Sequence, residues 1–220
     1  MATPIFLLTT TIALNFLCIA IAFDPWPLQD LCVADPTSPD FSVRVNGLAC
    51  KDPATVKADD FFFSGLHLPG NTSNRIGAAL TSVNVASVPG LNTLGLTLAR
   101  IDLARHGFVP PHYHPRATEV ITVLSGRLEV GFVESGSNRT HYKKSLKMGD
   151  VFVLPVGLPH YFRNVARTNT VALAVVNSQN AGIVTATQGV FGAEPPIDAG
   201  YLAKAYMLDQ KTIRRLEAAF

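Results

Sequence analysis

The sequence contains little charge for its length. Only 15% of its 220 residues are Asp, Glu, Lys or Arg, and the formal net charge is +2. No run of like charges or low-complexity tract occurs, and 48% of the residues are hydrophobic, which speaks against a disordered chain. The weak positive charge gives no support for binding to nucleic acid or to an anionic membrane surface. The length suits one domain with a sizeable core or two small domains.

Charged side chains are missing altogether from residues 1–22. A largely apolar run ends there in the small-residue pattern AIA, which is typical of a secretory signal peptide. We therefore expect a secreted mature chain that begins at Phe23, although the basic residues common at the start of signal peptides are absent. A membrane anchor is the alternative, but three threonines and an asparagine interrupt the run and no basic cluster follows it.

Cysteine is also scarce, with three residues in the whole chain. Cys18 falls inside the expected signal peptide and would leave with it, so the mature chain keeps Cys32 and Cys50. In an oxidising compartment these two would most simply form a disulfide, which the chain-entropy model values at about 3 kcal/mol for a loop of this size. Two unrelated buried thiols and a metal site are the alternatives, and a metal site lacks partner ligands at this spacing.

Two Asn-x-Ser/Thr sequons begin at Asn71 and Asn138, both in polar, turn-rich stretches. They predict N-glycosylation at the two asparagines. Because such sequons are common by chance, this prediction depends on the signal peptide.

Composition divides the chain after the signal peptide into three further parts. Residues 23–60 are rich in Pro and Asp and predict an extended N-terminal segment that the disulfide staples. Residues 61–197 contain many short apolar runs separated by Gly, Pro and Asn, which predicts an all-β antiparallel sandwich or barrel. Residues 198–220 predict two short helices, the second capped by Asp209.

Two strand patterns carry most of the information about burial. GRLEVGFVES alternates between apolar and charged residues, which predicts a strand with one buried face. LNTLGLTLARIDLA has Leu94, Leu96 and Leu98 on one face and Ile101 and Leu103 on the other. A strand that is apolar on both faces is expected to be covered on both sides, by a second sheet or by another subunit.

Two of the six histidines stand one residue apart in PPHYHPRATE. His112 and His114 would point to the same face of a strand, because residues i and i+2 of a strand share a face. Pro115 ends that strand, and turns would bring Glu119 and His160 to the starts of later strands. Three imidazoles and one carboxylate suit a divalent transition metal such as Mn, Fe, Ni, Cu or Zn. Ordinary strand histidines would be the better interpretation of an isolated His-x-His, but here the carboxylate and the third histidine accompany the pair.

The stretches that carry these residues resemble a known family. GFVPPHYHPRATEVITVLSG and GDVFVLPVGLPHYFRN resemble the two cupin motifs in the form found in plant germins and germin-like proteins. The second matches the pattern G-x5-P-x-G-x2-H-x3-N at every fixed position, whereas the first has His106 where the pattern has its leading glycine. PLQDLCVAD, GLNTLG, NSQNAGIV and FGAEPPI are also similar to germin segments, so the resemblance covers essentially the whole mature chain.

The resemblance implies a cupin jelly-roll β-barrel and the disulfide between the two remaining cysteines. It implies one manganese ion per chain, held by His112, His114, Glu119 and His160. It further implies a secreted glycoprotein of the plant cell wall, or apoplast, with a role in defence or stress. The resemblance also implies assembly as a hexamer of three dimers, in which the helical tail of each subunit packs against a neighbouring subunit.

Two chemistries compete within the family that the chain resembles. Germins proper are oxalate oxidases, and many germin-like proteins instead show superoxide dismutase activity. The asparagines thought to bind oxalate align with Ala99 and Val109, whose side chains cannot donate a hydrogen bond. The resemblance therefore favours superoxide dismutation, because superoxide needs only an open position on the metal. A non-catalytic binding, structural or nutrient-reservoir protein of the wall is the alternative from a different class.

Overall fold

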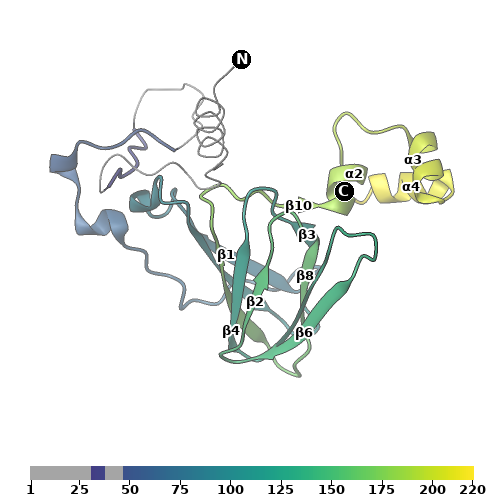
Figure 1. Cartoon of the computed structure of the whole chain (residues 1–220), viewed down its shortest axis with the longest axis horizontal. Helices are drawn as coiled ribbons and strands as arrows, with labels where there is room; N and C mark the ends of the chain where they lie inside the picture. The colour runs from purple at the N-terminus through teal and green to yellow at the C-terminus, as the bar shows by residue number, and fades with distance from the viewer. Residues whose placement is uncertain (1–30, 38–46) are drawn as a thin grey trace, which may run out of the picture.

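Two antiparallel sheets of five strands each build the body of the molecule (Figure 1). The computed structural model describes residues 31–37 and 47–220, so the expected signal peptide lies outside the described residues. The first sheet consists, in spatial order, of β1 (Ala78–Val83), β2 (Thr97–Leu103), β9 (Thr170–Val176), β4 (Glu119–Ser125) and β7 (Val151–Leu154). The second consists of β10 (Val184–Thr185), β3 (Phe108–Tyr113), β8 (His160–Asn164), β5 (Arg127–Val133) and β6 (His141–Lys147). The prediction of an all-β jelly-roll is confirmed.

The apolar core lies between the two sheets, where strand alternation places it. In β5, Leu128 and Val130 are completely buried, whereas Glu129 between them is on the opposite, partly exposed face. Ile121 of β4 and Phe162 of β8 belong to the same core cluster. Removing each of these large side chains from water stabilises the fold by about 2 kcal/mol. The alternation in GRLEVGFVES is therefore a correct prediction of one buried face.

The strand that the sequence predicts from Leu94 onward is shorter than expected. β2 begins only at Thr97, because Thr93 and Gly95 adopt positive φ angles of 65° and 64° that turn the chain away from extended backbone. Leu94 and Leu96 lie in this turn and are 47% and 40% exposed. The prediction of a strand face was wrong for these two leucines.

The N-terminal segment is held by a disulfide and by one buried amide. The disulfide joins Cys32 and Cys50. Asn92 is completely buried, and its side chain accepts a hydrogen bond from the backbone nitrogen of Leu48 and donates one to the carbonyl oxygen of Leu48, both at 2.9 Å. These contacts fix the segment to the turn that precedes β2. The 3-10 helices η1 (Pro53–Thr55) and η2 (Ala58–Phe61) lie in this segment and before β1, and η3 (Pro89–Leu91) lies between β1 and β2.

Three helices follow β10, one more than the sequence predicts, and they lie beside the barrel (Figure 1). They are α2 (Ala186–Phe191), α3 (Ala199–Tyr206) and α4 (Gln210–Glu217). Phe191, Leu202 and Ile213, one from each helix, form a small buried cluster. The helical part of the chain therefore begins at residue 186 rather than at 198, because α2 packs with the two later helices.

Asp209 begins α4 as predicted. Its carboxylate accepts a hydrogen bond from the backbone nitrogen of Thr212 at 2.8 Å, which satisfies one of the free N–H groups of the first turn. None of the helices within residues 31–37 and 47–220 is long and apolar enough to cross a membrane.

Asn164, the last residue of β8, joins three parts of the barrel. Its amide nitrogen donates to the carbonyl oxygens of Leu103, Ala104 and Thr168, at 3.2, 2.8 and 2.8 Å. Its amide oxygen accepts from the hydroxyl of Thr170 at 2.8 Å. Asn164 is buried, so water cannot replace these bonds. This network explains why the second motif ends in asparagine.

We expect Asn164→Ala to lower the free energy of unfolding by about 3 kcal/mol, because several buried groups lose their partner at once. Asn164→Asp should not restore stability, since a carboxylate oxygen would then face the carbonyl oxygens that the amide nitrogen now contacts. Urea unfolding of both variants and of the wild type measures the effect. Variants as stable as the wild type would contradict the proposed role of this network.

Candidate metal centre

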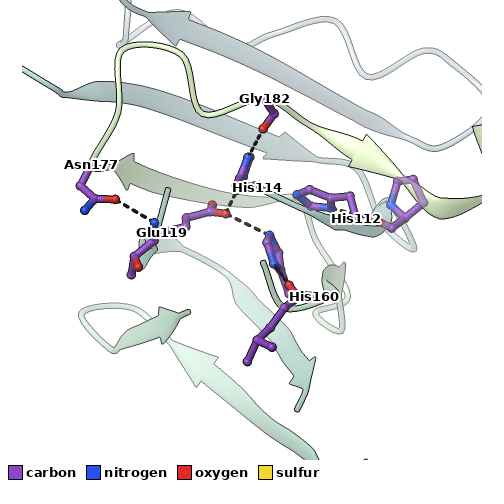
Figure 2. A network of polar contacts seen from close by, with 9 residues as sticks. His112, His114, Glu119, His160, Asn177 and Gly182 are labelled. Atoms are coloured by element: carbon purple, nitrogen blue, oxygen red, sulfur yellow. Dashed lines mark hydrogen bonds and ion pairs between the residues drawn. The ribbon is translucent and has the colours of Figure 1, made fainter. Parts of the chain in front are cut away.

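Three histidines and one glutamate meet between the two sheets (Figure 2). His112 lies in β3, His114 follows that strand, Glu119 begins β4 and His160 begins β8. Antiparallel pairing of β3 with β8 sets His112 opposite His160. The four side chains are buried, and one potential ligand atom from each lies within 4.8 Å of the others. The structure thus brings together all four residues that the sequence indicates as candidate ligands.

Backbone carbonyl groups orient all three imidazole rings. Nδ1 of His112 and of His160 each bind the carbonyl oxygen two residues earlier, at 2.8 and 2.9 Å. Nδ1 of His114 binds the carbonyl oxygen of Gly182 at 2.5 Å (Figure 2). Because a carbonyl oxygen only accepts, each Nδ1 carries a proton and donates it. Nε2 of each ring is therefore the atom left for a ligand, which is the usual arrangement of metal-binding histidines.

Glu119 lies beside two of the rings. Its Oε2 is 3.1 Å from Nε2 of His114 and 3.2 Å from Nε2 of His160 (Figure 2). The second contact lacks hydrogen-bond geometry, and among the described residues His160 Nε2 is the one buried side-chain nitrogen or oxygen without a hydrogen-bond partner. An unsatisfied buried polar atom costs about 1–3 kcal/mol. A metal ion would satisfy this atom, so the residues present fit such an ion.

The charge states of the group also suit a metal ion. Burial and the neighbouring His160 lower the pKa of His112 to about 4, so this ring is neutral at pH 7. Burial alone would raise the pKa of Glu119, but the imidazoles of His114 and His160 lower it to about 2, so the carboxylate is ionised. Burial would lower the pKa of His114, but its bonds to Glu119 and Gly182 outweigh burial and raise it. A metal ion therefore competes with a proton for Nε2 of His114.

The segment of residues 177–183, which follows β9, is tied to the turn between β3 and β4. The amide oxygen of Asn177 accepts from the backbone nitrogen of Thr118 at 2.7 Å (Figure 2). Arg116 donates from Nε to the carbonyl oxygen of Asn180 at 2.8 Å and from Nη2 to its side-chain oxygen at 3.0 Å. The planar guanidinium of Arg116 thus donates hydrogen bonds to both oxygens of Asn180.

Gly182 links this segment to the metal-binding group. Its φ of 68° is one that glycine adopts without strain, and a Cβ there would lie 2.9 Å from Nη2 of Arg116. This conformation lets the carbonyl oxygen of Gly182 reach His114. The sequence identifies NSQNAGIV only as a stretch similar to germins. Its role depends on contacts between residues more than 60 positions apart, which no local pattern reveals.

The metal-binding group lies at the wall of a cavity of about 420 Å³. His112, His114 and Glu119 line this cavity, and so do Ala99 of β2 and Val109 of β3. The two positions aligned with the asparagines of oxalate oxidases therefore face the site and contribute only apolar surface. No Lys or Arg side chain is among the described residues that line the cavity.

Comparisons with known proteins agree with this architecture. Residues 64–214 match the Cupin family. The chain is 54% identical over 200 residues to Putative germin-like protein 2-3 of Oryza sativa subsp. japonica, which covers 91% of this chain and 88% of that protein. It is also 54% identical over 200 residues to Germin-like protein subfamily 1 member 7 of Arabidopsis thaliana, with 90% and 86% covered. The chain belongs to the germin-like family of cupins.

A solved structure extends the similarity of this germin-like protein to three dimensions. Recombinant oxalate oxidase in complex with glycolate superimposes with a TM-score of 0.83 and 42% sequence identity. The match covers 90% of this chain and 98% of the oxalate oxidase chain. The germin-like fold therefore accounts for nearly the whole of the solved relative.

We expect Arg116→Ala to speed the loss of metal from this germin-like protein to a chelator by about tenfold, because the partner that orients His114 loses its support. Arg116→Lys keeps the charge but cannot donate to both oxygens of Asn180 in the same way. This variant should therefore lose metal at a rate between those of the wild type and Arg116→Ala. Stopped-flow transfer of metal from the loaded proteins to a coloured chelator gives the rates. Rates equal to that of the wild type in both variants would show that Arg116 does not position His114.

Proposed function

We propose that this germin-like protein is a secreted manganese protein of the plant cell wall, active in defence or stress, that dismutates superoxide. The observation that carries the proposal is a buried group of three imidazoles and one carboxylate at the wall of an apolar cavity. This mixed nitrogen and oxygen donor set suits manganese among the divalent transition metals. The choice of manganese and of superoxide follows the resemblance to germin-like proteins.

Manganese bound at this group would supply one-electron chemistry by cycling between two oxidation states. His112, His114 and His160 would hold the ion through Nε2, and their carbonyl partners would keep the rings from rotating away. Glu119 would contribute the anionic oxygen and remain ionised throughout the physiological pH range. The carbonyl partners would thus hold the three rings in place, and the ion would replace the proton between Nε2 of His114 and Glu119.

Ala99 and Val109 argue against oxalate as the substrate. The solved relative is an oxalate oxidase bound to glycolate, so the fold is compatible with that chemistry. Oxalate carries two carboxylates, and the one directed away from the metal needs hydrogen-bond donors. Neither Ala99 nor Val109 offers a donor, and an ionised carboxylate left unpaired beside them would cost more than the about 2–7 kcal/mol of an unpaired neutral polar group. Superoxide is small enough to bind without this second set of contacts.

The disulfide and the two sequons support secretion of a glycosylated protein. A disulfide such as Cys32–Cys50 persists in oxidising compartments and is rare in the cytosol. The side chains of Asn71 and Asn138 are both exposed, as glycosylation requires. These features are the ones expected of a protein that leaves the cell through the secretory pathway.

Metal content and two activities, measured on one sample, test the proposed function. Protein purified from its native compartment should contain manganese and turn over superoxide but not oxalate, whereas a foreign host can load a different metal. His160→Ala should lower metal content and superoxide turnover together, each by at least about tenfold, because it removes one of four ligands. His67→Ala changes an exposed histidine away from the group and should alter neither.

Three results would change the proposal in different ways. Oxalate turnover by the wild type would contradict the weight placed on Ala99 and Val109. Stoichiometric metal with neither activity would favour a non-catalytic binding, structural or nutrient-reservoir protein. Superoxide turnover with another metal would change the cofactor and keep the reaction.

We further propose that copies of this chain assemble, as a hexamer of three dimers. On the outer face of the first sheet, Val120 of β4 and Val153 of β7 are paired neighbours, and both are exposed. Val151 of β7 and Met207, which follows α3, are also exposed apolar residues. Exposed apolar surface of this kind supports burial against another subunit.

We expect Val153→Glu to weaken the assembly by at least about tenfold, because an unpaired carboxylate would be buried at the contact. The side chain points away from the core, so the barrel itself should remain folded. Light scattering over a range of concentrations gives the mass of wild type and variant. Val165→Glu, at an exposed valine after β8, is the matched control, and a wild type that runs as a monomer would refute the assembly.

A further inference from the structure

The cavity beside the metal-binding group is far larger than superoxide requires. Its volume of about 420 Å³ lies in the range of small-molecule binding sites in proteins. Superoxide has only two atoms and needs one open position at the metal. Most of the cavity therefore has no role in the proposed reaction.

The walls of the cavity come from both sheets. Ile101 of β2 and Ala174 of β9 line it from the first sheet, and Val109 of β3 and Phe162 of β8 line it from the second. A space between the inner faces of two packed sheets has two roughly parallel apolar walls. Such a slot suits a flat ring, which buries a large apolar area on both of its faces.

Two neutral amides lie toward the open part of the cavity. Gln179 and Asn180 line it, and Asn180 is exposed to solvent. The side-chain oxygen of Gln179 accepts from the backbone nitrogen of Thr93 at 2.7 Å, and that of Asn180 accepts from Arg116. Neither amide nitrogen donates to another described residue, so both can donate to the outer end of a ligand.

The net charge of a metal-loaded site would favour a ligand that carries a single negative charge. A divalent ion and the carboxylate of Glu119 together carry one positive charge. Apart from Glu119, His112 and His114, no acidic or basic side chain is among the described residues that line the cavity. A ligand with one carboxylate balances this charge, whereas a second carboxylate would bring a second negative charge into the cavity without a cation to balance it.

We propose that the cavity binds a hydroxylated aromatic monocarboxylic acid. Its carboxylate lies at the metal-binding group, its ring lies between the walls formed by Ile101 and Val109, and its hydroxyl accepts from the amides of Gln179 and Asn180. The proposal rests on a metal at this group, as the proposed function does, and it adds an organic ligand class to that function.

Calorimetric titration of the metal-loaded mature protein with 4-hydroxybenzoate tests the proposal. The loaded protein should bind 4-hydroxybenzoate at least about tenfold more tightly than the metal-free protein does, and at least about tenfold more tightly than it binds oxalate. Val109→Phe fills part of the slot and should weaken binding by at least about tenfold while metal content is unchanged. Val165→Phe makes the same substitution outside the cavity and should bind as the wild type does. If Val109→Phe fails to fold, Ala99→Leu fills the cavity with a smaller side chain and replaces it.

Each contrary result has a definite meaning. No binding at millimolar 4-hydroxybenzoate, tighter binding of oxalate, or equal binding by metal-free protein would overturn the proposal. Equal binding by the wild type and the cavity-filling variant would overturn it as well, because the ligand would then lie elsewhere. Superoxide turnover is measured on the same samples: binding without turnover would refute the proposed reaction alone, and turnover without binding would refute this proposal alone.

Discussion

A buried carboxylate surrounded by three imidazoles is the constraint on which the rest of the structure depends. Glu119 and the histidines are removed from water, yet the protein supplies each ring with only one carbonyl partner and leaves His160 Nε2 with none. Buried polar groups in this state are costly unless something else joins them. The free energy of metal binding offsets this cost, so the site couples metal affinity to the stability of the barrel.

The barrel meets this constraint by placing the ligands at strand ends, where backbone geometry is fixed. β8 is only five residues long, and it carries His160 at its start and Asn164 at its end. The hydrogen bonds of Asn164 to β2 and to the following turn anchor one end of the strand, which limits movement of His160 at the other. Strand pairing then fixes His112 opposite His160. Sites built on paired strands are positioned more accurately than sites built on loops alone.

The features predicted from the sequence are those that short stretches encode. Alternation revealed the buried face of β5, and the local capping pattern revealed Asp209. The prediction of a strand at Leu94 was wrong because Thr93 and Gly95 adopt left-handed backbone conformations. The spacing of apolar residues contains no information about such conformations. Helix α2 was missed because it is short and is stabilised by packing with α3 and α4 rather than by its own pattern. The hydrogen bonds of Arg116 to Asn180 were missed because they, too, depend on contacts between distant parts of the chain.

Charge balance at the site connects the two proposed ligands. Superoxide and an aromatic monocarboxylate are both monoanions, and each matches the single positive charge of a divalent ion beside Glu119. Apolar walls lower the local dielectric constant, which strengthens the attraction for one negative charge and raises the cost of a second. Under these proposals, Ala99 and Val109 would select among ligands because their side chains offer no hydrogen-bond donor. A carboxylate bound at the metal-binding group would exclude superoxide from it, so the large cavity would make the proposed superoxide reaction sensitive to an organic acid.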